Sequence, residues 1–316
     1  GEHAHPGNEG CVRAGSPCPP GGWHVIEDEG EFVLYVKPGG MGDGMSPDQP
    51  LGDIQTAHNL AIQGSIILVA PGTYTTPLFI NKEVTLIGAC SEATKIAPPQ
   101  SAKGDAISVI SPTTIKNFTI SGGRWGVFVK SSGVTTLEGL VIEGVRLGAV
   151  SVFGDGLSTQ VVLKDSAVRD IQLDGTVGEG FGVSIQDARA SLERVSINNV
   201  YNFGLTALSS TLDLKDIVIE NIMSFSKSEE KGYGGIAVVA TTVTGEGLVV
   251  RGSENVGIGG WSNSVFRLSD VVVTDSIGPG IFFVDSRAEV SKMEVHNIEE
   301  DAMVLSNASL ELERFR

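Results

Sequence analysis

The sequence predicts an all-β fold, a right-handed parallel β-helix in which short strands wind into stacked coils of about 22 residues. Three observations lead to this prediction. Apolar runs led by glycine recur at a nearly fixed spacing, a second strand-like run precedes each of them, and charged residues at equivalent positions alternate in sign. Such a chain buries its apolar residues along an axis rather than around one centre.

The leading glycines set the period of the predicted coils. Runs such as GVFV, GVSI and GIFFV start 22, 34, 22, 31, 22 and 23 residues apart, and Ala302 follows 22 residues later. A basal period with two longer members is typical of a solenoid that carries insertions. The glycines are Gly126, Gly148, Gly182, Gly204, Gly235, Gly257 and Gly280.

A second strand precedes each leading glycine and ends at a turn. Runs such as LERVSI and LKDIVI are followed two residues later by Gly, Asp or Asn, which tolerate left-handed backbone. We expect asparagines stacked at equivalent turns to bond one another. The turn residues are Gly144, Asp170, Asn199, Asn221, Gly252, Asp275 and Asn297.

The charged residues test this alignment independently, because like charges directly opposed on neighbouring strands, about 4.8 Å apart, are destabilising. One column reads Glu138, Lys164, Glu193, Lys215 and Glu246, and a second reads Glu143, Arg169, Asn198, Glu220, Arg251, Thr274 and His296. In both columns acid mostly meets base. The same alignment turns these residues inward: Leu163, Val168, Val183, Leu192, Ile197, Leu205, Leu214, Ile219, Ile236, Leu268, Val273 and Ile281.

The chain divides into a Pro/Gly-rich segment, residues 1–31, and a single β-helix domain, residues 32–316. The stretch DIQTAHNLAIQG has apolar residues at helical spacing and predicts an amphipathic helix near residues 52–63 that covers the open end of the first coil. The last segment, LELERFR, begins a new coil. We therefore expect either that the native chain continues beyond Arg316 or that another chain covers that end.

The three cysteines indicate the compartment. Cys11 and Cys18 lie in CVRAGSPCPPGG, a segment with little secondary-structure signal of its own that a disulfide would fix in place. Cys90 is the alternative partner, and the sequence leaves the pairing open. A disulfide favours an extracytoplasmic location, whether secreted, periplasmic or on the cell surface.

The N-terminal part of the domain resembles a known family. VKPGGMGDGMSPDQPLGDIQTA, followed by VAPGTY and VTLIGA, looks like the N-terminal signature of the pectin-lyase-like right-handed β-helix superfamily. With the coils, the resemblance extends from about Phe32 to the C-terminus and implies the fold. It implies no activity, because the superfamily includes lyases, hydrolases, epimerases and adhesins.

The net charge of −16 and the sequence pI near 4.7 limit the partners. They argue against nucleic acid, and against polyanionic sugars unless a cation such as calcium intervenes. A neutral glycan remains compatible. No cofactor is expected. Calcium is a possible ion, at a Gly-rich turn with Asp43 and Asp48, although an ordinary polar turn also explains these residues. The longest apolar runs are too short to span a membrane.

No catalytic centre is identified from the sequence. The motifs of polygalacturonase-like members, Asn-Thr-Asp, Asp-Asp, Gly-His-Gly and Arg-Ile-Lys, are absent. Asp165, Arg169, Asp170 and Arg194 are the nearest approach to a lyase-like cluster of acids and a base. The predicted charge columns and turns account for them equally well.

Two coils carry insertions at the same turn. Asp170 to Gly182 spans 12 residues and Asn221 to Gly235 spans 14, whereas ordinary coils need four or five. Since one short coil lies between them, the insertions should form the walls of a groove, and aromatic rings beside carboxylates are typical of sugar-binding clefts. The alternative is a pair of insertions without function. The candidate groove residues are Tyr201, Phe203, Tyr233, Asp174, Glu179, Glu229, Glu230, Lys227 and Lys231.

A second candidate surface is an apolar stripe. Val218, Val249 and Val272 occupy equivalent outward positions and are expected to be exposed, which suggests a protein partner or an overlying segment.

We therefore expect a secreted or cell-surface β-helix protein that binds a glycan or a cell-envelope component. One alternative is a polysaccharide lyase or glycoside hydrolase that uses acids of the two insertions. Another is a structural segment of a longer surface protein.

Overall fold

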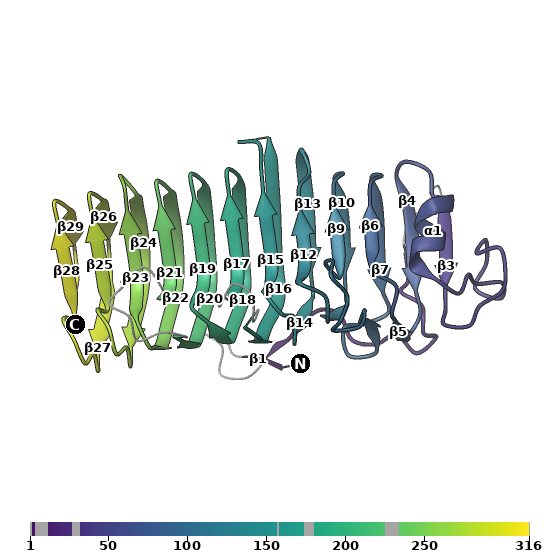
Figure 1. Cartoon of the computed structure of the whole chain (residues 1–316), viewed down its shortest axis with the longest axis horizontal. Helices are drawn as coiled ribbons and strands as arrows, with labels where there is room; N and C mark the ends of the chain where they lie inside the picture. The colour runs from purple at the N-terminus through teal and green to yellow at the C-terminus, as the bar shows by residue number, and fades with distance from the viewer. Residues whose placement is uncertain are drawn as a thin grey trace.

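The computed structural model describes residues 2–3, 12–26, 32–156, 158–173, 180–224 and 234–315. The chain forms an elongated stack of coils, with helix α1 (Ile54–Leu60) at one end and the C-terminus at the other (Figure 1). Two long parallel sheets run along the stack. Outside them, β1 (Glu2–His3) and β2 (Val12–Arg13) pair antiparallel. The predicted parallel β-helix is confirmed.

One of the long sheets has ten described strands and the other has seventeen. The ten-stranded sheet consists of β6 (Leu78–Ile80), β9 (Ile107–Val109), β12 (Trp125–Val129), β15 (Gly148–Phe153), β17 (Phe181–Gln186), β19 (Phe203–Leu208), β21 (Gly234–Val239), β23 (Val256–Trp261), β25 (Ile281–Val284) and β28 (Met303–Ser306). The seventeen-stranded sheet consists of β3 (Val33–Val36), β4 (Ser65–Val69), β5 (Gly72–Tyr74), β7 (Val84–Gly88), β8 (Thr94–Ile96), β10 (Thr113–Lys116), β11 (Thr119–Ser121), β13 (Gly133–Glu138), β14 (Val141–Glu143), β16 (Thr159–Ile171), β18 (Arg189–Tyr201), β20 (Thr211–Met223), β22 (Thr242–Ser253), β24 (Val265–Thr274), β26 (Arg287–Val290), β27 (Met293–His296) and β29 (Ser309–Leu312).

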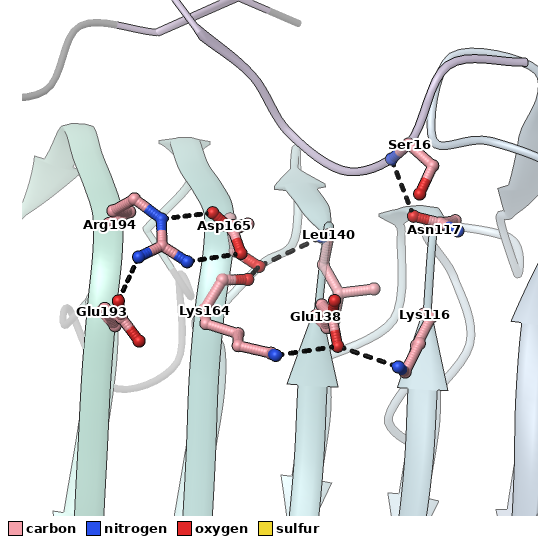
Figure 2. Close-up of polar contacts among 10 residues, drawn as sticks. Ser16, Lys116, Asn117, Glu138, Leu140, Lys164, Asp165, Glu193 and Arg194 are labelled. Carbon is pink, nitrogen blue, oxygen red and sulfur yellow. Dashed lines mark hydrogen bonds and ion pairs between the residues drawn. The ribbon is translucent and has the colours of Figure 1, made fainter. Parts of the chain in front are cut away.

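The charge columns confirm the register of the seventeen-stranded sheet. Glu138 pairs with Lys164 on the next strand, and its Oε2 lies 3.0 Å from Lys116 Nζ and 3.2 Å from Lys164 Nζ (Figure 2). In the second column, Arg169 pairs with Glu143, and Arg169 Nη2 lies 2.6 Å from Glu143 Oε2. Opposite charges on adjacent coils therefore stabilise the parallel stacking.

The core lies between the two sheets and follows the axis of the stack. All twelve side chains predicted to face inward belong to one continuous apolar cluster, and the most exposed of them, Leu268, is only 6% exposed. The inward placement of these twelve residues is therefore confirmed.

The predicted turn residues adopt left-handed backbone, as expected. Asp170, Asn199 and Asn221 have φ values of 54°, 53° and 55°. Asn199 Nδ2 donates a hydrogen bond of 3.0 Å to Asp170 Oδ1, so polar side chains at this turn do bond across coils. Further left-handed bends lie inside the long strands, at Asp165 (φ 49°) and Arg194 (φ 51°) among others. These bends were not predicted, because the runs LKD and LER read as straight strand in the sequence.

The prediction that Gly148 is the leading, inward-facing glycine of its coil was wrong. Gly126 lies opposite Ala149, while Gly148 pairs with Trp125 and Phe181. The indole of Trp125 packs over Gly148, where a Cβ would lie 2.1 Å from the ring. Gly148 is therefore small because a tryptophan covers it, and Ala149 holds the place predicted for glycine.

Helix α1 forms where the sequence predicted a helix. At the start of the helix, Asp53 Oδ1 accepts a hydrogen bond from Thr56 N. At its end, Lys82 Nζ donates hydrogen bonds to the carbonyl oxygens of Asn59 and Ala61. Ile54 and Ala57 pack into the main core. That this helix protects the end of the solenoid stays a prediction.

The disulfide joins Cys18 to Cys90, with their Cα atoms 4.9 Å apart. A bond between Cys11 and Cys18 is therefore wrong, and Cys11 itself lies outside the described residues. The bond holds the N-terminal segment against the seventeen-stranded sheet, where Ser16 N donates to Asn117 Oδ1 at 3.1 Å (Figure 2).

The apolar stripe is less exposed than predicted. Val218 is only 7% exposed, and Val249 and Val272 are half-buried. Further along the same column, Val141 and Ala167 are covered by Ala14 of the N-terminal segment. An overlying segment is thus present at Val141 and Ala167 of this column, and an overlying segment at the stripe itself stays a prediction. A protein partner at Val249 and Val272 stays a prediction.

Candidate functional site

The strands of the ten-stranded sheet contain no Asp, Glu, Lys or Arg over their described length. The whole chain has 60 such residues, and the outward face of the other sheet carries them in columns. Charged side chains are the default on a solvated sheet face. Their absence from ten consecutive strands singles out this face as a candidate binding surface.

The middle column of this face is small and hydroxylated. Ser151, Ser184 and Thr206 pair in register on β15, β17 and β19, followed by Ala237 and Gly259 on the next two strands. These residues alternate with core residues such as Val150, so they point away from the core. This part of the column carries one hydroxyl on each of three consecutive coils and lies between Phe128 and Phe282 of the same column.

The hydroxyls of Ser151, Ser184 and Thr206 donate no hydrogen bond to any described part of the protein. The hydroxyls at the neighbouring corner behave differently. Those of Ser210 and Thr241, for example, donate to the carbonyls of Leu208 and Val239 at 2.7 and 2.8 Å. A hydroxyl offers one donor and two acceptor sites. The hydroxyls of the half-buried Ser184 and Thr206 are thus accessible to a ligand, whereas Ser151 is only 9% exposed and the corner hydroxyls serve the fold.

Aromatic side chains line one edge of the face. The rings of Trp125 and Phe181 are 5.6 Å apart, and those of Phe181 and Phe203 are stacked at 5.0 Å with an interplanar angle of 3°. Trp125 reaches Phe181 across Gly148, which has no side chain. The three rings form a continuous aromatic ladder along the turn edge, and its half-buried members offer apolar area beside the hydroxyl column.

Both insertions leave this same edge, since one precedes β17 and the other precedes β21. Tyr201 and Phe203, predicted to form the groove floor, lie at the coil between them and are half-buried. The other predicted groove residues lie outside the described residues, and their role stays a prediction. They are Asp174, Glu179, Lys227, Glu229, Glu230, Lys231 and Tyr233.

The acids and bases that came closest to a lyase-like cluster take part in structural pairs. Arg194 Nε and Nη2 donate to both carboxylate oxygens of Asp165, at 2.6 and 2.9 Å. These bonds raise the pKa of Arg194 further above its usual range, so it cannot serve as a base. Arg169 is paired with Glu143. Within the described ranges, no group of three or more His, Cys, Asp or Glu is arranged to hold a metal ion.

The hydroxyl column was not predicted from the sequence, because serine and threonine carry no charge and match no catalytic motif there. The signal was present in the printed sequence, since none of the glycine-led runs contains a charge. In the part of the chain that the structure describes, no helix is long and apolar enough to cross a membrane.

No family model matches the sequence, and no curated protein sequence matches it. Solved structures do share its fold. Pectate lyase Pel9A superposes with a TM-score of 0.59 at 14% identity, covering 90% of this chain and 78% of that one. A rhamnogalacturonan lyase gives 0.62 at 10% identity, covering 88% and 86%. The polygalacturonase from Erwinia carotovora ssp. carotovora gives 0.53 at 10% identity, covering 92% and 96%.

The chain therefore shares the right-handed parallel β-helix fold of these solved structures. At identities of 10–14%, the likeness shows the fold alone, and function must be argued from the site.

Proposed function

We propose that this protein binds a neutral glycan, free or in a cell envelope, on the uncharged face of the ten-stranded sheet, and that it acts outside the cytoplasm. The observation that carries the proposal is the column of Ser151, Ser184 and Thr206, whose hydroxyls have no partner among the described residues of this charge-free sheet.

The chemistry of the face favours a neutral ligand. A polyanionic sugar needs Lys or Arg, and the strands of the face provide neither. The net charge of −16 would also repel it. A neutral glycan needs hydroxyl partners and apolar surface for its C–H faces, which the hydroxyl column and the aromatic ladder supply. The structural neighbours named above, two lyases and a polygalacturonase, act on polysaccharides, which supports a carbohydrate ligand.

Binding without turnover fits the described part of the face. A general acid or base must lie within hydrogen-bond reach of the proton it transfers, and the strands contain no carboxylate or basic side chain. A glycoside hydrolase or polysaccharide lyase is the second candidate, because the insertions leave the edge of this same face. In such an enzyme, Glu179 or Glu230 would supply the catalytic carboxyl group. The Cys18–Cys90 disulfide supports an extracytoplasmic location.

The test is a glycan array that includes neutral chains and polyuronates, followed by calorimetric titration and a turnover assay on any neutral oligosaccharide that binds. Ser184→Ala and Thr206→Val should each weaken binding about 2- to 12-fold, as expected for one lost hydrogen bond. Thr136→Val is the matched control, since Thr136 is a half-buried outward threonine on the other sheet. Equal effects of Thr206→Val and Thr136→Val, or a preference for polyuronates, would overturn the proposal.

A further inference from the structure

A small pocket borders the uncharged face at the edge opposite the aromatic ladder. It has a volume of about 150 Å³ and is lined by Lys130, Ser132, Phe153, Asp155 and Thr159, with Ser131 and Gly154. Phe153 ends β15 and lies two residues beyond Ser151, so the pocket adjoins the hydroxyl column. It also contains the charged groups Lys130 and Asp155, which the strands of the face lack.

The carboxylate of Asp155 is held in place by hydroxyl donors. Thr159 Oγ1 donates to Oδ1 at 3.0 Å and Ser132 Oγ donates to Oδ2 at 3.2 Å, while Ser158 Oγ also donates to Oδ1. These hydrogen bonds, that from Ser158 first, lower the pKa of Asp155, so it stays ionised in mildly acidic solution. Asp155 is exposed and has no ion-pair partner among the described residues. It is a fixed negative charge at the mouth of a pocket.

The ring of Phe153 already attracts a cation. Lys130 Nζ lies 5.7 Å from its centroid, within the range of a cation–π contact. The ring is 42% exposed, so a ligand can reach it. The lysine is itself exposed and has a long, flexible side chain. A second cation that also pairs with Asp155 would therefore find the ring accessible and the lysine free to move aside.

We propose that this pocket selects, within a glycan whose other units are neutral, a unit with a free, protonated amino group, and so directs binding on the uncharged face towards chains that contain amino sugars. This inference rests on the proposed function. The ligand ammonium pairs with Asp155, the sugar ring lies against Phe153, and Lys130 moves into solvent. The negative charge of the whole chain draws the cation towards the site.

An anionic sugar held by Lys130 is the opposite use of the same pocket. The fixed carboxylate of Asp155 would repel it, because Asp155 is rigidly placed and Lys130 is not. Substitution of Lys130 separates the two directly. Removing a competing cation strengthens the binding of an amine, whereas removing an anion-binding group weakens the binding of a carboxylate.

The experiment is calorimetric titration with three oligosaccharide probes of equal length: glucosamine oligomers, their fully N-acetylated forms and oligogalacturonates. The pH is one at which the amine is protonated. The wild type should prefer the amine. Asp155→Asn should weaken amine binding about two- to fivefold, as for an exposed ion pair, and leave the acetylated probe unchanged. Lys130→Gln should strengthen amine binding. Asp301→Asn, an exposed acid distant in sequence, controls for net charge.

Each other outcome overturns the inference. If Lys130→Gln weakens oligogalacturonate binding and Asp155→Asn strengthens it, the pocket is an anion site. If Asp155→Asn and Asp301→Asn have equal effects, the amine responds only to net charge. If the wild type binds the neutral probe but has no amine preference, the inference fails while the proposed function stands. If no probe of any class on the array binds, both fail.

Discussion

Gly204→Ala tests the packing between coils most sharply. Gly204 opens the run on β19, and a Cβ at this position would lie 2.5 Å from Gly235 O on the next coil and 2.6 Å from Ile219 Cγ2 in the core. Both distances are far inside van der Waals contact, and the carbonyl cannot move without separating β19 from β21. Overpacking of this kind costs about 1–3 kcal/mol of unfolding free energy. The melting temperature should fall by about 2–10 °C.

The assay is thermal unfolding followed by circular dichroism, with Gly104→Ala as the matched control. Gly104 has no neighbour within 4 Å of its added Cβ, so this variant should melt within about 1 °C of the wild type. Equal melting temperatures for the two variants would refute the close approach of the coils at Gly204, and with it the inward placement of the glycine column.

Three further predictions concern the helix, the disulfide and the second insertion. Burial, and secondly the positive charge of Lys82, lowers the pKa of His58 below 6.5, so His58 binds a proton more readily in the unfolded chain than in the folded one. The unfolding free energy, measured by urea denaturation at a series of pH values, should therefore fall as the pH drops below about 6.5. His58→Leu should make the unfolding free energy less dependent on pH in this range. Cys18→Ser should lower the unfolding free energy by about 2–4 kcal/mol in the same assay, through loss of the bond to Cys90 across 72 residues; an unchanged midpoint would contradict this role. Replacing residues 223–233 with a five-residue turn should leave the melting temperature nearly unchanged, because loop-closure entropy varies slowly with length, while glycan affinity falls; unaltered affinity would make the segment an ordinary insertion.

The coil register could be predicted because parallel stacking repeats each position once per coil. Glu138 and Lys164 are 26 residues apart in sequence, yet the sign alternation of their column was enough to align them. A local pattern fails where two small residues are adjacent. Gly148 and Ala149 both fit the glycine position, and only the indole of Trp125 over Gly148 decides between them.

The disulfide could not be predicted, because the partner of Cys18 is chosen by spatial proximity. Cys90 is distant in sequence, and it approaches Cys18 because the N-terminal segment lies against the sheet, where Ala14 O accepts a hydrogen bond from Ser91 Oγ. The same segment covers Val141 and Ala167, which lie in the same outward column as the predicted apolar stripe.

From the sequence we predicted residues at the edge of the candidate site, but not the hydroxyl column at its centre. Tyr201 and Phe203 were found through the insertions on either side of them. The hydroxyl column was not, because serine and threonine also serve the fold: Ser210 and Thr206 look alike in sequence. Only the structure shows that Ser210 donates to a backbone carbonyl and Thr206 does not.

The most direct test of the central claim is the affinity for a neutral oligosaccharide of two variants that place an arginine on opposite sheets. Thr206→Arg puts a long charged side chain on the uncharged face, and Thr136→Arg puts the same side chain on the other sheet. Circular dichroism melting checks that both variants fold. Glycan binding on the ten-stranded sheet predicts that Thr206→Arg loses affinity and Thr136→Arg keeps it. Retention of affinity by a folded Thr206→Arg would contradict the assignment.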